Sequence, residues 1–220
     1  MQAELEALTK VFDENEDPAT TTIKENLIAA INYEQPEIMP EINLRTRNGE
    51  SALSMAAKHG FSNAVKFFIS KGANKEHFTN KHHTPLSLAV SYNHLKVVQV
   101  LFEDWISPNS HKKTYLHLSP IFNVKSREIA QVLIDNDAVT HEIYNNKNQS
   151  PLTVACQNGY RDVVEFFLDD GLDINHLDND NKTPLFYALA NKHHEIANLL
   201  ISQGAQNELL HDQSMHKPKY

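Results

Sequence analysis

The chain has 220 residues, of which 40% are hydrophobic and 22% are charged, and its formal net charge at pH 7 is −8. This is enough apolar material for a continuous core, which argues against a wholly disordered chain. The acidic balance also argues against a general phosphate-binding surface, because such a surface needs clustered basic residues to gain free energy from counterion release. We therefore expect no nucleic acid among its partners.

Two further features favour a cytoplasmic location. No apolar stretch reaches the roughly 18 residues of a membrane-spanning helix, and the first residues, Met1-Gln2-Ala3-Glu4-Leu5-Glu6, are acidic where a signal peptide is basic. The single cysteine, Cys156, excludes an intramolecular disulfide and a cysteine-rich zinc site. We predict a cytoplasmic protein with no membrane partner, stabilised by packing alone.

The beginning of the chain has the pattern of a helical cap. Asp17-Pro18 interrupts an amphipathic pattern in residues 5–12, and Thr22 with Glu25 has the spacing of a capping box for the next helix. We expect residues 1–40 to form a helical N-terminal cap or degenerate repeat. The apolar side of its second helix would carry Ile23, Leu27, Ala30 and Ile31.

A six-residue pattern recurs through most of the remaining chain. It consists of a small or hydroxyl residue, a proline in most copies, a leucine, two variable residues and a small residue. Successive copies begin 33, 30, 36 and 33 residues apart, which averages to 33. Repetition at this period indicates a stack of short structural units. The five copies begin at Ser51, Thr84, Thr114, Ser150 and Thr183.

Each copy has the residues that start a helix. A hydroxyl side chain can cap free amides, and proline at the first helical position has no amide to leave unpaired. In the regular copies an apolar run with helical spacing follows about 13 residues after the start. The turns between and after the two helices require residues that tolerate positive φ. To these turns we assign Gly60, Gly72, Asn93, Asn123, Gly159, Gly171 and Gly204, with Gly49 at the tip of the turn before the first copy.

The repeated unit resembles the ankyrin repeat. Residues 171–175 (GLDIN), followed by Asp178 and Thr183-Pro184-Leu185, are similar to that family's inter-repeat hairpin and helix start. The resemblance implies an all-α ankyrin-repeat solenoid of helix-turn-helix pairs with β-hairpin-like fingers, made of five recognisable repeats and a degenerate N-terminal cap. We expect the array to span residues 41–207 and residues 208–220 to form a C-terminal tail. The alternative is an unrelated array of helical pairs.

The third unit departs from the pattern. Trp105 stands where neighbouring units have glycine, and a bulky aromatic residue does not adopt positive φ without cost. Thr114 follows three residues early, so we expect a shortened finger before it. Two interpretations of Trp105 stay open. Its side chain is either an anchor for a partner or a filler of the space that the shorter finger leaves.

The 13 histidines do not have the spacing of a metal site. Adjacent pairs such as His82-His83 point their rings in different directions, and closely spaced cysteine–histidine sets are missing. The ankyrin resemblance implies a structural role for His117. Cys156 stands where a small buried residue is needed, and no phosphate loop or nucleophile elbow occurs. We predict no enzymatic activity, no metal and no cofactor.

The resemblance also implies partner contacts on a concave face, formed by the finger tips and the ends of the first helices. The 25 positions mapped to this face include six Lys or Arg and two Asp or Glu, whereas the whole chain has 20 basic and 28 acidic residues. We therefore predict a partner with an acidic segment around an apolar anchor, with Tyr92, Ile121 and Phe122 as the apolar centre. Ordinary solvated charge is the alternative. The predicted partner-binding residues are Arg47, Lys58, His59, Lys81, His83, Tyr92, Trp105, His111, Lys113, Ile121, Phe122, Lys147 and Gln157.

Together these features predict a monomeric protein–protein interaction module that acts as an adaptor or scaffold. The alternative is a regulatory inhibitor that masks a surface of another protein, and a partner's loss of activity on binding would distinguish the two. Abundant Asn, Lys and His beside only six glycines suggest an AT-rich genome. Ankyrin proteins of intracellular bacteria and viruses often act inside a host, so an effector secreted into a host cell's cytoplasm is a further hypothesis.

Overall fold

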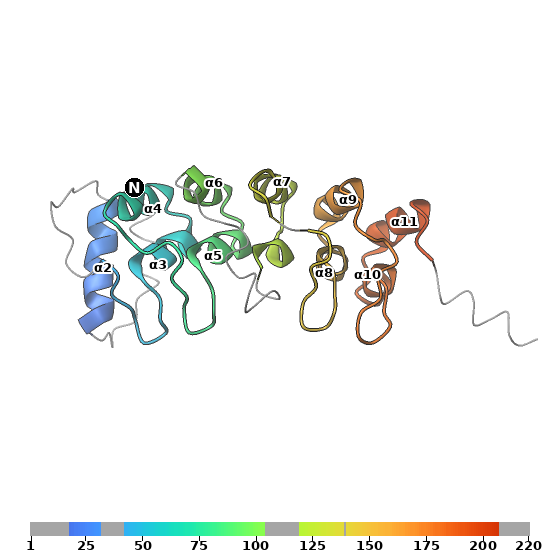
Figure 1. Ribbon diagram of the computed structural model, residues 1–220, viewed down its shortest axis with the longest axis horizontal. Helices are drawn as coiled ribbons and strands as arrows, with labels where there is room; N and C mark the ends of the chain where they lie inside the picture. Colours follow the sequence, from blue (N-terminus) through green and yellow to red (C-terminus); the bar gives the residue numbers. More distant parts are fainter. Residues whose placement is uncertain (1–17, 32–41, 104–118, 139, 207–220) are drawn as a thin grey trace, which may run out of the picture.

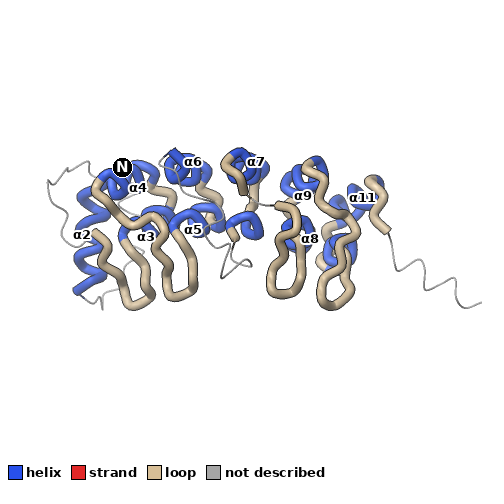
Figure 2. Tube along the Cα trace, viewed as in Figure 1, coloured by secondary structure: helices blue, strands red, loops and turns tan. Residues whose placement is uncertain are grey.

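The computed structural model describes residues 18–31, 42–103, 119–138 and 140–206. Within these ranges the chain consists of helices joined by turns and loops, and no strand is assigned (Figure 2). The all-α prediction is therefore confirmed. Several positions singled out above lie outside the described residues, namely residues 5–12, Trp105, His111, Lys113, Thr114 and His117.

The helices stand in two rows that follow the order of the chain, and the fingers project from the row of first helices (Figure 1). We number the repeats by their helices. Repeat 1 contains α3 (Ala52–His59) and α4 (Ser62–Ser70), repeat 2 contains α5 (Pro85–Ser91) and α6 (Leu95–Glu103), and repeat 3 contains the 3-10 helix η2 (Pro120–Asn123) and α7 (Arg127–Asp135). Repeat 4 contains α8 (Pro151–Asn158) and α9 (Arg161–Asp169), and repeat 5 contains α10 (Pro184–Ala190) and α11 (His194–Ser202).

The first helices begin where the hydroxyl residues predicted. Ser51 Oγ accepts a hydrogen bond from the backbone N–H of Ser54 at 3.2 Å, and Ser54 Oγ accepts one from the N–H of Ser51 at 2.7 Å. Thr84 and Ser87 form the same reciprocal pair in repeat 2. The side chains of Ser150 and Thr183 also cap their helices. These bonds satisfy amides that would otherwise lack a partner at the helix start.

The turns also follow the sequence, with two exceptions. All six glycines and Asn93 have positive φ, as predicted. Asn123 does not, because it ends the 3-10 helix and the chain continues in extended conformation at Val124. Between α10 and α11 the positive-φ residue is Lys192, with φ of 62°, which the sequence did not suggest.

One further helix, α2 (Pro18–Ile31), packs against α3 and α4 at the end of the two rows (Figure 1). Its buried residues include Ile23, Leu27 and Ala30, as the sequence predicted. The capping box predicted at Thr22 and Glu25 is wrong, because the helix begins one turn earlier. Thr22 lies inside α2, where its hydroxyl donates to the carbonyl oxygen of Pro18 at 3.1 Å.

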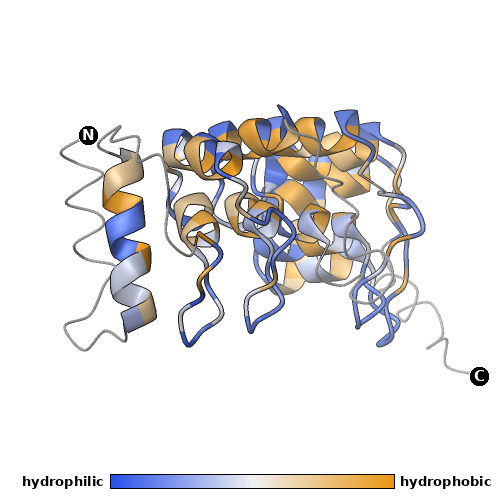
Figure 3. Cartoon of the chain, turned by 60° about the vertical axis from the view of Figure 1, so that its left-hand side comes forward, coloured by the Kyte–Doolittle hydropathy of each residue, from blue (hydrophilic) through white to orange (hydrophobic). Residues whose placement is uncertain are grey.

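The core runs between the two rows of helices. Apolar residues gather on the helices while the fingers are hydrophilic (Figure 3). Phe68 of α4 and Phe167 of α9 are among the largest fully buried side chains. Cys156 is also buried, and burial raises the pKa of its thiol, as expected for a packing residue. No helix in the described ranges is long and apolar enough to cross a membrane.

The prediction that Ile121 and Phe122 form the apolar centre of a binding face is wrong. Only 1% of Ile121 and 6% of Phe122 is exposed, and both belong to the core. The reason is the irregular spacing of repeat 3, where a 3-10 helix stands at these positions instead of the end of a regular first helix. This turn directs the two side chains inward, beside the buried Val124.

Candidate partner-binding surface

We call the surface formed by the finger tips and the exposed sides of the first helices the finger surface. Each finger is closed by its own hydrogen bonds. In repeats 1 and 2, Thr46 N–H donates to the carbonyl oxygen of Glu50 at 2.9 Å, and Thr79 N–H donates to that of His83 at 2.9 Å. The fingers are therefore hairpin-like turns of defined shape that present their tips to solvent.

Neighbouring fingers are also joined to one another. The backbone N–H of Asn80 donates to the carbonyl oxygen of Asn48 at 3.0 Å, and the side chain of Asn80 donates to that of Arg47 at 2.8 Å. His77 Nε2 lies 2.6 Å from the carbonyl oxygen of Gly49. These contacts fix the spacing between the first two tips.

The same joints recur between repeats 4 and 5. Asn179 N–H donates to the carbonyl oxygen of Lys147 at 2.9 Å, and His176 Nε2 lies 2.6 Å from the carbonyl oxygen of Asn148. Asn179 and His176 each follow Asn80 and His77 by 99 residues, which is three average repeats. Recurrence at this offset is the sequence signal that would have identified them.

A second histidine joint lies at the ends of the first helices. His94 Nε2 is 2.9 Å from the carbonyl oxygen of Lys58, and His193 Nε2 is 3.2 Å from that of Gln157. The ring of His94 lies so near Gly60 that a Cβ atom there would come within 2.6 Å of its Nδ1. The joint thus requires a residue without a side chain at the end of α3.

A hollow opens on the finger surface between the fingers of repeats 1 and 2, and we call it the N-terminal hollow. Its volume is about 600 Å³. It collects residues from three successive repeats, because Lys125 reaches it from the loop between η2 and α7. It is lined by Asn48, Glu50, Lys58, Thr79, Asn80, Lys81, His83, Leu88, Ser91, Tyr92 and Lys125.

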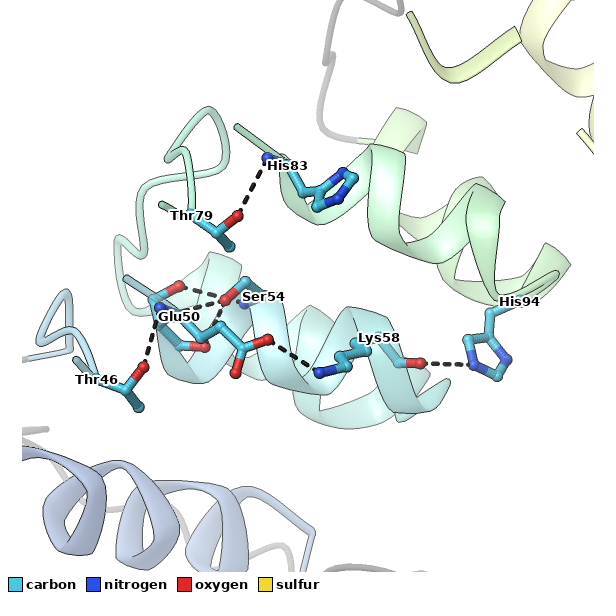
Figure 4. A network of polar contacts seen from close by, with 8 residues as sticks. Thr46, Glu50, Ser54, Lys58, Thr79, His83 and His94 are labelled. Carbon is cyan, nitrogen blue, oxygen red and sulfur yellow. Dashed lines mark hydrogen bonds and ion pairs between the residues drawn. The ribbon is translucent and has the colours of Figure 1, made fainter. Parts of the chain in front are cut away.

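The N-terminal hollow carries an excess of positive charge. Lys58 Nζ lies 3.0 Å from Glu50 Oε1 along α3, and this pair faces the finger that carries His83 (Figure 4). Lys81 and Lys125 are exposed and form no ion pair with any residue in the described ranges. Three ammonium groups and one carboxylate leave a net charge of +2 on a chain whose formal charge is −8.

His83 adds hydrogen-bonding capacity to the hollow. Burial and the neighbouring charge of Lys81 lower the pKa of His83 below its usual value of 6.5. At neutral pH its ring is therefore uncharged. Protonation below that value would add positive charge between the two fingers.

Tyr92 supplies an aromatic surface beside these lysines. It is 52% exposed, and its ring stacks on that of His94 with centroids 6.5 Å apart and planes 7° apart. Because His94 is itself held by its bond to α3, the exposed ring is supported from behind. Of the three residues predicted to form an apolar centre, Tyr92 alone is exposed.

The corresponding hollow of repeats 4 and 5, which we call the C-terminal hollow, is chemically different. Its volume is about 330 Å³. Gln149 and Gln157 stand where repeat 1 has Glu50 and Lys58, and their side chains make a hydrogen bond of 3.4 Å. The hollow is lined by Asn145, Asn146, Lys147, Gln149, Val154, Gln157 and Asn158.

The other predicted site residues lie as follows. Arg47 and Lys147 are exposed at their finger tips. His59 is half-buried and stacks on Phe61, and its Nε2 atom is buried without a hydrogen-bond partner. Sequence reasoning missed Lys125, because no regular repeat spacing relates it to the finger tips. Among the described residues, no group of three or more His, Cys, Asp or Glu side chains could hold a metal ion.

The architecture defines a helical-repeat protein, with paired helices, hairpin-like fingers and joints at a constant offset. Residues 23–112 and 116–210 match the family of ankyrin repeats. The chain belongs to the ankyrin repeat family.

Its relatives include proteins of several kinds. An ankyrin repeat and KH domain-containing protein of Caenorhabditis briggsae is 29% identical over 161 residues, which cover 71% of this chain and 6% of that protein. Rabankyrin-5 of Homo sapiens is 26% identical over 214 residues, covering 92% of this chain and 18% of that protein. The protein named "Probable 26S proteasome regulatory subunit p28" of Saccharomyces cerevisiae is 34% identical over 134 residues, 58% of each. The chain thus spans less than two thirds of these relatives.

Proposed function

We propose that this chain is a protein-binding adaptor or scaffold that contacts its partner through the finger surface. Ankyrin repeats are generally protein–protein interaction modules and typically are not enzymes. The observation that carries the proposal is the set of joints between fingers, which hold side chains from successive repeats at fixed spacing. A surface ordered before binding loses little conformational entropy when a partner docks.

The partner that suits this surface presents an acidic segment with an apolar anchor. Lys81 and Lys147 stand at exposed tips and would steer an acidic partner by long-range attraction. Tyr92 takes the place of Ile121 and Phe122 as the anchor contact, since it is exposed and held by His94. Aromatic residues in such positions commonly dominate interface energies.

The proposal extends to the organisation of the chain. It assigns residues 1–40 to an N-terminal cap, 41–207 to the array and 208–220 to a tail. The packing of α2 on α3 and α4 supports the cap. The protein would act as a monomer in the cytoplasm, either of its own cell or of a host.

Site-specific cross-linking tests the proposal. A photoreactive amino acid at Tyr92 should capture a partner from cell lysate, while the same group at Gln99, exposed on α6 in the other row of helices, should not. The double change Lys81→Glu and Lys147→Glu should slow association with the captured partner and weaken its salt dependence. Capture of the same proteins from both positions, or of none, would contradict the proposal.

A regulatory inhibitor would use the same surface. The captured partner distinguishes the two functions, because an inhibited partner loses activity when the chain is added and a scaffolded one does not.

A further inference from the structure

We infer that the N-terminal hollow is an anion-selective subsite and that the C-terminal hollow is not, so that an acidic peptide segment docks at one end of the array only. The inference rests on the proposed function, because it names where on the finger surface the acidic part of a partner binds. It goes further by separating two surfaces that share one backbone geometry.

The first reason is the difference in charge at matched positions. Repeats 1 and 2 map onto repeats 4 and 5 at an offset of 99 residues, so that Lys81 corresponds to Asp180 and Lys58 to Gln157. The N-terminal hollow therefore has ammonium groups where its counterpart has a carboxylate and an amide. Carboxylates of a bound peptide would be attracted to the first and repelled from Asp180 at the second.

The second reason is Lys125, which gives the N-terminal hollow a charge from a third repeat. The 3-10 helix that buries Ile121 and Phe122 precedes Lys125, and repeat 3 differs in this respect from the regular repeats. The irregular spacing of repeat 3 thus removes two apolar residues from the finger surface and adds a cation to it.

The third reason is the aromatic side chain. Tyr92 corresponds to Asn191 in repeat 5, and Leu88, which also lines the N-terminal hollow, corresponds to Tyr187. A peptide bound between Lys81 and Lys125 would have the Tyr92 ring within reach for an apolar side chain. The C-terminal hollow offers amide side chains instead, which suit an uncharged polar chain.

The subsite can be tested with a capped peptide of glutamates around a central leucine, and with the same peptide carrying glutamine at every glutamate position. Amide resonances of the full chain should shift near Asn80, Tyr92 and Lys125 when the acidic peptide is added at low salt. Those near Asn146 and Asn158 should not. The glutamine peptide should bind at least about fivefold more weakly, because it lacks the charges that the lysines attract.

Matched variants locate the selectivity. Lys81→Gln and Lys125→Gln should each weaken binding of the acidic peptide about fivefold, whereas Lys147→Gln should change it less than about twofold. These lysines are exposed, so unfolding temperatures equal to that of the unchanged chain are the control. The double change Asp180→Lys and Asn191→Tyr should create a second binding site in repeats 4 and 5.

Several outcomes would overturn the inference. These are equal shifts at both hollows, equal effects of Lys81→Gln and Lys147→Gln, equal binding of the glutamine peptide, no binding of the acidic peptide, or binding of inorganic phosphate alone as tightly as the peptide. The proposed function fails independently if cross-linking at Tyr92 captures no partner. Peptide binding at the N-terminal hollow would still stand in that case.

Discussion

Repeats 1–2 and repeats 4–5 share one framework but differ in the side chains that face a partner. At an offset of 99 residues the capping residues, the two glycines after the first helices and both pairs of joint histidines are identical or equivalent. At the same offset an ion pair between Glu50 and Lys58 becomes a hydrogen bond between Gln149 and Gln157. The comparison separates the residues that build the framework from those free to define a binding surface.

The fingers show the same separation in a buried position. Thr79 Oγ1 accepts a hydrogen bond from the backbone N–H of His83 at 3.1 Å, and at the matched position Asp178 Oδ1 accepts one from that of Lys182 at 2.9 Å. Burial raises the pKa of Asp178, but hydrogen bonds from Tyr187 and from backbone amides outweigh it and leave the pKa below its usual value. The turn is therefore kept while the group that closes it changes from a hydroxyl to a carboxylate.

The largest expected effect tests whether the two cores are equivalent. Phe68→Ala and Phe167→Ala each remove a fully buried ring at the matched position of α4 and α9. Each should lower the free energy of unfolding by about 3–5 kcal/mol, from lost burial and the cavity left behind. Urea denaturation followed by circular dichroism measures both losses. A difference larger than about 2 kcal/mol would show that the halves are not equivalent in packing.

A smaller effect is expected at the histidine joints. Gly60 and Gly159 have φ of 81° and 78°, and a Cβ atom at either would lie 2.6 Å from a histidine ring. Gly60→Ala and Gly159→Ala should each cost roughly 1–3 kcal/mol in free energy of unfolding, from the left-handed backbone and the displaced ring. Adding His94→Ala to Gly60→Ala relieves the contact alone. If that double variant is as unstable as the sum of the single changes, the contact contributes nothing.

The smallest effect is a dependence of stability on pH that should belong to repeat 1 only. Burial, followed by the charge of Lys58, lowers the pKa of His59 below 6.5, so the unfolded chain binds its proton more readily than the folded chain. Stability from this residue is complete above pH 6.5 and is lost as the pH falls through the lower folded-state value. Repeat 4 has Asn158 at this position, which bonds to the carbonyl oxygen of Val154 at 3.0 Å.

His59→Asn copies repeat 4 and should flatten the decrease in unfolding temperature between neutral and mildly acidic pH. Asn158→His should add such a decrease to repeat 4. If His59→Asn leaves the pH profile unchanged, the remaining histidines, including His83, account for it.

Much of the framework followed from the sequence because its causes are local. Hydroxyl residues at Ser51, Thr84, Ser150 and Thr183 cap helices within three residues of themselves, so the helix starts could be read directly. The exposed Tyr92 was also found in this way, through the regular spacing of its repeat. Thr22 shows the limit, since a capping pattern inside a longer helix is indistinguishable from one at its start.

Local chemistry thus determined by itself that the chain forms paired helices at a period of 33 residues, with turns at its glycines. The tertiary structure decided which side chains reach the finger surface. Ile121 and Phe122 are buried and Lys125 reaches the N-terminal hollow because the 3-10 helix of repeat 3 packs against its neighbours. The histidine joints likewise depend on atoms 28 to 36 residues apart in the chain, and only stacking of the repeats brings these atoms within hydrogen-bonding distance.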